Sequence, residues 1–213
     1  HCTSSAASDV YKRQTGTTQY EIASNNTNAI YQGGIVIPTS AGVIDISDQA
    51  VAPLGVFYGV EYVDSGTKKT TFKNFWPGSN NVSVDTNFPI KAFVFDNPMQ
   101  LFTVVADGTN TDRATALADI FANATMASVN NGSTNTGRST DMLDISTAAT
   151  TATLDVRIVG LYEDEGNTDY SAVGHQYIVR LLGHFNSGFA AAVGTAANTC
   201  LLYTSPSPRD FQV

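Results

Sequence analysis

Short apolar runs, most of them alternating with polar residues, recur along this chain between clusters of Gly, Pro, Asn, Asp and Ser. Alternation with a period of two is typical of strands that bury one face, and such clusters are typical of turns. The clearest alternation places Leu154, Val156 and Ile158 on one face. We expect nine strands, at 18–23, 29–38, 43–46, 53–63, 69–75, 88–95, 101–106, 152–162 and 175–185.

A helical pattern occurs in one segment, 112–124, which begins at a suitable N-cap, Asp112. Four of its residues recur at the i, i+3, i+4, i+7 spacing of a helix face: Ala114, Leu117, Ala118 and Phe121. The stretch 125–140, rich in Gly, Asn, Ser and Thr, has no period and is predicted to be a loop. Together these patterns predict a mainly β fold, an antiparallel β-barrel or sandwich with at most one or two short helices.

The two ends differ from the rest of the chain. Residues 1–14 and 200–213 lack the alternation and resemble the translated adapter sequences found at the edges of reading frames assembled from environmental reads. We expect both to be non-native tails, and they contain both cysteines of the chain. The residues between them, 15–199, are predicted to form a single β-rich domain, with a subdivision near 107–140 as the alternative.

The chain is acidic, with 11 basic and 19 acidic residues and a formal net charge of −8. Only 14% of its residues are charged. Such a surface, without a basic stripe, disfavours binding to nucleic acid or to anionic lipid. No apolar stretch approaches the length of a membrane span, and no signal peptide is readable. We therefore expect neither nucleic acid nor a membrane as a partner.

Few residues offer metal chemistry. His175 and His184 are nine positions apart on one expected strand, which directs them to opposite faces and disfavours a shared metal. The acidic stretch from Glu163 to Asp169 surrounds a glycine and carries the oxygen ligands that calcium prefers. It lacks the spacing of an EF-hand, however, and a solvated loop between two strands explains it at least as well.

Catalytic motifs are similarly weak. Glycosidase chemistry requires two facing carboxylates, and no spacing selects a pair among the available candidates, Asp96, Asp141, Asp144 and Asp155. Neither a Gly-x-Ser-x-Gly elbow nor a phosphate-binding glycine pattern is present. We therefore assign no catalytic, cofactor-binding or metal-binding residue and expect that the protein is not an enzyme.

One segment, KKTTFKNFW at 68–76, interleaves lysines with aromatic residues, as proteins that bind single-stranded nucleic acid do. Trp76, the only tryptophan, or Tyr62 could instead offer a flat platform to a sugar ring. The interpretation that we favour is a hairpin whose aromatic residue is buried and whose lysines face water.

Glycine and strand motifs recur near the N-terminal side of the chain, in AIYQGGIVI (29–37), GVI (42–44) and LGVFYG (54–59). These three segments resemble the opening of tailed-phage head decoration proteins. Further motifs are FKNFWP (72–77), TGRS (136–139) and AATTATLDVRIVGL (148–161), which look like proteins of marine bacteriophage structural modules. Together the resemblance covers about residues 18–185.

This resemblance implies a virion structural protein, a decoration subunit that binds the major capsid protein outside the head and stabilises the shell. It also implies a homo-oligomer, often a trimer, that is made in the host cytoplasm and located in the capsid. It implies no catalytic residue and no cofactor. The alternative is a carbohydrate-binding or adhesin-type β module, as in receptor-binding or fibre proteins, acting through Trp76 and the acidic stretch.

Overall fold

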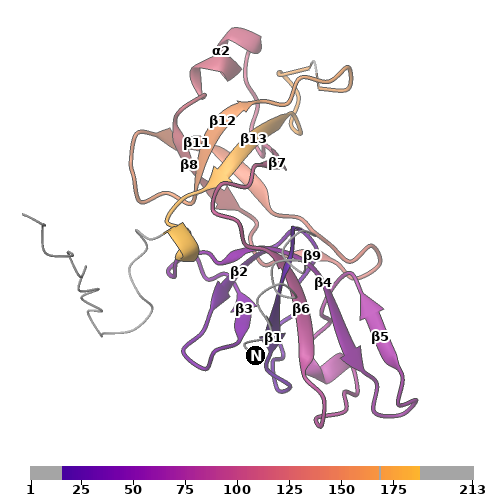
Figure 1. The fold of residues 1–213 in the computed structure, drawn as a ribbon. Coiled ribbons are helices and arrows are strands. Elements are labelled where there is room, and N and C mark those ends of the chain that lie inside the picture. Colours follow the sequence, from indigo (N-terminus) through magenta and orange to yellow (C-terminus); the bar gives the residue numbers. More distant parts are fainter. Residues whose placement is uncertain (1–15, 168, 188–213) are drawn as a thin grey trace, which may run out of the picture.

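The computed structural model describes residues 16–167 and 169–187, and strands dominate it (Figure 1). The expected tails lie outside these residues. The first eight elements are β1 (Thr18–Ile22), β2 (Ile35–Pro38), β3 (Ile44–Ile46), β4 (Gly55–Val63), β5 (Thr70–Lys73), the 3-10 turn η2 (Ser79–Asn81), β6 (Ile90–Phe95) and β7 (Phe102–Val105). The others are α2 (Arg113–Ala118), β8 (Asn123–Ala127), β9 (Gly132–Ser133), β10 (Arg138–Ser139), β11 (Met142–Ala149), β12 (Val156–Leu161), β13 (Gln176–Leu181) and the 3-10 turn η3 (Phe185–Ser187).

The mainly β fold with little helix is confirmed, whereas the helix expected at 112–124 is confirmed only in its first half, because it ends at Ala118 and β8 begins at Asn123. The side chain of Asp112 accepts a hydrogen bond from the backbone N–H of Thr115 at 2.8 Å, and α2 begins at the next residue after this cap. No helix in the described part of the chain is long and apolar enough to cross a membrane.

β1, β2, β3, β4 and β6 form a closed ring, which we call the first barrel. Their pairings run β2–β3–β1–β6–β4, and a further pairing between β2 and β4 closes the ring. Neighbouring strands are antiparallel except β1 and β3, which meet in parallel at Ile22 and Ile44. β5 lies outside the ring, paired with the second half of β4.

β7, β8, β11, β12 and β13 form the second barrel. Their pairings run β11–β8–β12–β13–β7, all of them antiparallel. A parallel bridge between Ala106, next to β7, and Leu143 of β11 joins the two edge strands. The N–H of Asp107 strengthens this closure by donating to the carbonyl of Leu143 at 3.0 Å.

The two barrels have the same topology. When the five strands of each are counted in chain order, they follow one another around the ring as 1-5-4-2-3, and the first and third are parallel. The register also agrees, because Gly59 pairs with Phe93 as Gly160 pairs with Ile178, each after a one-residue shift. These matching pairings equate the residues of the two barrels one by one.

The sequence keeps a trace of this repeat. IDIS at 44–47 and LDIS at 143–146 begin at equivalent positions of the third strands, because their first residues form the two parallel bridges. We infer that one five-stranded unit occurs twice in the chain, with β5, α2 and the β9–β10 hairpin as additions to one copy or the other.

Each barrel has its own core. The first contains Phe57, Val60 and Trp76, and the second contains Leu143, Ile158 and Tyr177. The β9–β10 hairpin lies over the first barrel (Figure 1) and forms a parallel bridge from Arg138 to Gln32. The contact between the barrels is therefore made partly by backbone pairing.

The predicted loop at 125–140 is wrong in part, and β11 was not expected. The region includes most of β8 and the β9–β10 hairpin. Polar residues next to the core bond between β8 and the β11 segment: Asn123 donates to the carbonyl of Thr151 at 2.9 Å, and the Thr147 hydroxyl accepts from the Thr125 N–H at 3.0 Å. Only two residues of each strand point into the core, Ala124 and Met126 of β8 and Leu143 and Ile145 of β11, and so short an alternation does not predict a strand.

Candidate functional site

Four aromatic side chains gather on the outer surface of the first barrel, and we call this surface the aromatic face. It consists of Tyr58, Phe72, Phe93 and Phe95, from the three adjacent strands β4, β5 and β6. The rings of Phe72 and Phe93 are 5.9 Å apart, and those of Tyr58 and Phe95 are 5.5 Å apart in an edge-on arrangement. Phe72 is 56% exposed and Tyr58 is 44% exposed.

Strand alternation places these rings outside the barrel. Phe57 and Val94 point inward and are fully buried, so their neighbours point outward. The Phe72 ring lies over Gly59, where an added Cβ would be only 2.8 Å from its Cζ. The glycine at the register shift therefore leaves room for the ring.

The rim of the aromatic face is charged. Lys91 and Glu61 form an ion pair of 3.3 Å on the same side of β6 and β4. In the second barrel, the positions equivalent to Tyr58, Phe93 and Phe95 hold Val159, Ile178 and Arg180. The aromatic face is thus a property of the first barrel alone.

Trp76 and Tyr62 cannot serve as sugar platforms. Both are buried in the first core, with their rings edge-on at 5.9 Å, and the Trp76 Nε1–H donates to the carbonyl of Asn26 at 3.2 Å. The platform prediction is wrong, and the favoured interpretation, a buried aromatic residue beside exposed lysines, is confirmed. Trp76 forms an antiparallel bridge with Ile30, which is buried in the same core.

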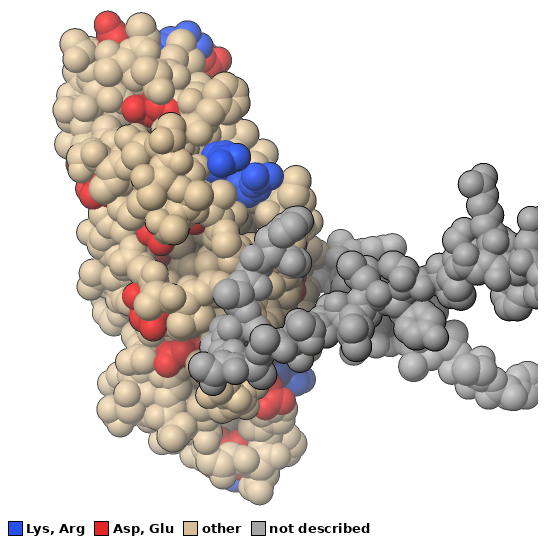
Figure 2. All heavy atoms as spheres, turned by 90° about the vertical axis from the view of Figure 1, so that its left-hand side faces the viewer, with Lys and Arg blue, Asp and Glu red and all other residues tan. Residues whose placement is uncertain are grey.

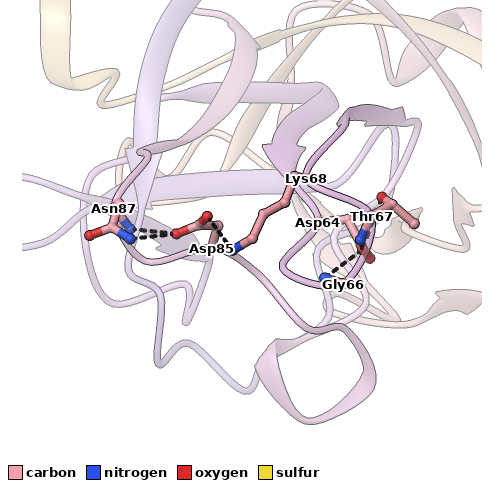
Figure 3. A network of polar contacts seen from close by, with 6 residues as sticks. All are labelled: Asp64, Gly66, Thr67, Lys68, Asp85 and Asn87. Atoms are coloured by element: carbon pink, nitrogen blue, oxygen red, sulfur yellow. Dashed lines mark hydrogen bonds and ion pairs between the residues drawn. The ribbon is translucent and has the colours of Figure 1, made fainter.

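Lys68, the first basic residue of the segment 68–76, belongs to a polar network at the tip of the β4–β5 hairpin (Figure 3). Its Nζ lies 2.9 Å from Oδ2 of Asp85, and the Asn87 side chain donates to Oδ1 of Asp85 at 2.8 Å. In the adjoining turn, Oδ1 of Asp64 accepts from the N–H of Thr67 at 2.7 Å. These contacts fasten the hairpin tip to the loop before β6, a structural role.

This network should make stability depend on acid pH. The Lys68 ammonium, followed by the Asn87 donors, holds the pKa of Asp85 below its ordinary value. Because the folded pKa is depressed, the stabilisation is complete above the unfolded value of about 4 and is lost as pH falls through the folded value. We expect Asp85→Asn to lower the melting temperature at pH 7, and this difference from wild type to shrink below about pH 4. Thermal denaturation between pH 7 and pH 2 measures this difference in melting temperature. A difference that is as large at pH 2 as at pH 7 would contradict the stabilising role of the Asp85 carboxylate.

The described residues of the acidic stretch, 163–167 and 169, lie in the loop between β12 and β13, as the solvated-loop interpretation expects. Glu163 pairs with Arg113 from α2, and Asp169 accepts hydrogen bonds from the backbone and hydroxyl of Ser171. An open hollow of about 830 Å³ lies between this loop and the helix. Among the residues that the structure describes, no three acids, histidines or cysteines come together as metal ligands.

The two histidines lie just beyond opposite ends of β13, as expected for polar residues at strand ends. Both are buried. The His175 ring lies 5.1 Å from the Tyr177 ring, whose hydroxyl donates to Asp119 at 2.9 Å. Nδ1 of His184 accepts from the N–H of Asn186 at 3.1 Å, and burial lowers its pKa. The contacts of both histidines therefore indicate a role in the fold.

The four candidate carboxylates are dispersed. Asp96 accepts hydrogen bonds near β1, Asp144 accepts from Ser146 on an exposed part of β11, and Asp155 accepts from the N–H of Met126. Asp141 lines a cavity between the barrels, and burial raises its pKa. Three of them line three different hollows, which gives no facing pair for glycosidase chemistry.

Charge is sparse on the surface as well. Figure 2 shows one long face of the molecule on which acidic and basic side chains are few and scattered. No protein-family model, curated protein or solved structure matches the chain. The aromatic face is therefore the feature from which a function is best inferred.

Proposed function

We propose that the protein is a structural component of a tailed-phage virion, a decoration subunit that binds the major capsid protein through the aromatic face. The resemblance of the segments at 29–37, 42–44 and 54–59 suggested this class, and the aromatic face carries the proposal. Contiguous exposed aromatic residues with a charged rim are typical of protein–protein contacts, because the rings contribute large apolar areas with few rotamers to fix.

The aromatic face suits a protein partner better than a sugar. Three of its four rings are phenylalanines, which carry no group to bond a sugar hydroxyl, and the nearby charged pair Glu61–Lys91 is self-satisfied. With Trp76 buried, the carbohydrate-binding alternative has also lost its proposed platform. In this proposal the protein is not an enzyme: it acts by binding in the capsid and stabilising it.

Mass spectrometry of purified virions of the phage that encodes the chain tests the location. We expect its peptides in DNA-filled particles at an abundance comparable with that of the major capsid protein. Detection only in lysates of infected cells, never in particles, would refute the proposal.

Phe72→Ser tests the aromatic face. Truncation of a central aromatic contact weakens an interface by about 2 kcal/mol, so the affinity for heads that lack the subunit should fall roughly 30-fold. Phe88→Ser is the matched control, because Phe88 is 54% exposed but lies in the loop before β6, outside the aromatic face. Co-sedimentation of each variant with such heads measures binding. Equal losses for the two variants, or no loss for Phe72→Ser, would exclude the aromatic face.

A further inference from the structure

The contact between the two barrels is built around an apolar cavity of about 290 Å³. Gly33 and Val56 line it from the first barrel, and Phe102 and Leu181 line it from the second. The hairpin bridge at Gln32 lies beside it, with the Gln32 N–H donating to the carbonyl of Gly137 at 2.9 Å. One end of the second barrel thus rests on one side of the first.

The repeat maps the first barrel's half of this contact onto the second barrel. Gly33 donates to the carbonyl of Phe57 at 2.8 Å, and Phe121 donates in the same way to Ile158 at 2.9 Å. Gly33 therefore corresponds to Phe121. The matching strand pairs Val56–Phe95 and Arg157–Arg180 make Val56 equivalent to Arg157.

Phe121 is unusual in two independent ways. Its φ of 73° lies in the left-handed region, which the equivalent Gly33, at 91°, adopts without strain. It is also 80% exposed, more than the other large apolar side chains in the described part of the chain. The single chain gains little contact from a strained and exposed phenylalanine, as expected for a residue that serves an interface.

The repeat also maps the second barrel's half of the contact onto the end of the first barrel. Phe102 corresponds to Thr18, because each pairs with an equivalent valine, Val179 or Val94. Arg180 is equivalent to Phe95, so the next residues, Leu181 and Asp96, also correspond. Thr18 and Asp96 line a polar hollow of about 570 Å³ at that end. The oxygens of Asp96 accept from the hydroxyls of Thr18 and Tyr20 at 2.8 and 2.7 Å.

Arg157 and Asp96 are electrostatically complementary. Nε of Arg157 donates to the Asn123 side chain at 3.0 Å, and the residue is exposed. The ion pairs among the described residues involve neither Arg157 nor Asp96. Within the chain, Val56 and Leu181 line the apolar cavity between the barrels. The residues equivalent to them, Arg157 and Asp96, carry opposite charges.

We propose that these two surfaces bind each other between copies of the chain: the Phe121 side of the second barrel receives the Asp96 end of the first barrel of the next copy. In this contact Arg157 pairs with Asp96 of the neighbouring copy, and the Phe121 ring packs beside this pair and excludes water from it. The contact repeats, between molecules, the arrangement that already joins the barrels within one. It lacks the β9–β10 hairpin, because the first barrel has only the short turn at 39–43 in its place.

Such a contact joins two different surfaces, so it generates a closed ring, of two or more copies, or an open array. It uses Phe121, Arg157 and Asp96, none of which belongs to the aromatic face, although Asp96 directly follows Phe95 of that face. The inference goes beyond the proposed function and does not depend on it. Failure to bind phage heads and failure to self-associate are separate results.

A double-mutant cycle on the full-length chain tests the pairing, with self-association measured by sedimentation velocity and native mass spectrometry. Arg157→Gln and Asp96→Asn should each weaken association about tenfold or more, and the double variant should lose little beyond either single one. Lys69→Gln, an exposed cation on β5's hairpin, is the control and should leave association unchanged. Additive losses, or a wild-type protein that stays monomeric up to its solubility limit, would overturn the proposal.

Phe121→Gly gives a second, independent readout. It should weaken association while leaving the melting temperature of the dilute, dissociated protein equal or higher, because glycine adopts the left-handed backbone without strain. A purely structural role for the ring predicts a lower melting temperature and unchanged association, and that result would refute the interface.

Discussion

Trp76→Ala is expected to lower the free energy of unfolding by about 3–5 kcal/mol, the range typical for removal of a large buried aromatic residue. Trp76 is fully buried in the core of the first barrel, where it contacts the Tyr62 ring edge-on at 5.9 Å. The substitution leaves a cavity in a small core and leaves the carbonyl of Asn26 without the indole donor. Urea denaturation followed by far-UV circular dichroism measures the loss.

Trp76→Phe is the matched control, because it keeps an aromatic ring against Tyr62 and removes the Nε1 donor. The free energy of unfolding of Trp76→Phe should lie between the values for the wild type and for Trp76→Ala. A loss below about 1 kcal/mol for Trp76→Ala would contradict the burial of this side chain. It would also reopen the sugar platform that the structure excludes.

The strands that the sequence predicted well share one property. In β4 and β12 an apolar residue at every second position points into a core, as Phe57 and Ile158 do, so the pattern and the burial coincide. In β8 and β11 the inward residues are also apolar, Ala124 and Met126 in the first and Leu143 and Ile145 in the second. Each strand has only two of them, so the alternation is too short to stand out among the surrounding Gly, Asn, Ser and Thr residues.

The repeat of the two barrels was not predictable from one-dimensional periodicity. Equivalent strands are separated by different numbers of residues, because β5, α2 and the β9–β10 hairpin are inserted at different points. Beyond IDIS and LDIS, the equivalent positions share character more than identity, as Phe57 and Ile158 do. Only the strand register equates them.

The aromatic face was missed for a related reason. Tyr58 and Phe72 belong to separate predicted strands, and Phe93 to a third, so no sequence window contains the cluster. The pairing of β4 with both β5 and β6 brings the three strands together. The segment 68–76 is unusual in its sequence, but its tryptophan is buried and the ring that it exposes is that of Phe72.

The two candidate interfaces use different residues and make different physical demands. The aromatic face is broad and apolar, which suits a stable contact with a shell. The surfaces around Phe121 and Asp96 combine one exposed ring with opposite charges, which gives orientation and salt dependence. In the function that we propose, the aromatic face would bind the capsid and the surfaces around Phe121 and Asp96 would bind other copies of the chain.

Gly55→Ala is expected to lower the free energy of unfolding by about 3 kcal/mol, at the upper end of the cost of overpacking. A Cβ on Gly55 would lie 2.2 Å from the carbonyl oxygen of Phe95 and 2.9 Å from Cγ1 of Val94. The nearest atom is backbone, so β4 and β6 must separate where the ring closes between β2 and β4. Trp76 fluorescence follows this barrel selectively, because the chain has no other tryptophan.

Gly160→Ala is the matched control, since an added Cβ there meets nothing within 4 Å. Alanine restricts the unfolded chain without creating a clash, so this variant should be unchanged or gain about 0.5 kcal/mol by circular dichroism. The equivalent of Gly55 in the second barrel is Val156, so the second barrel accommodates a β-branched residue at this position of the repeat. Equal stabilities for Gly55→Ala and Gly160→Ala would mean that the first barrel does not close as tightly as the β2–β4 pairing requires.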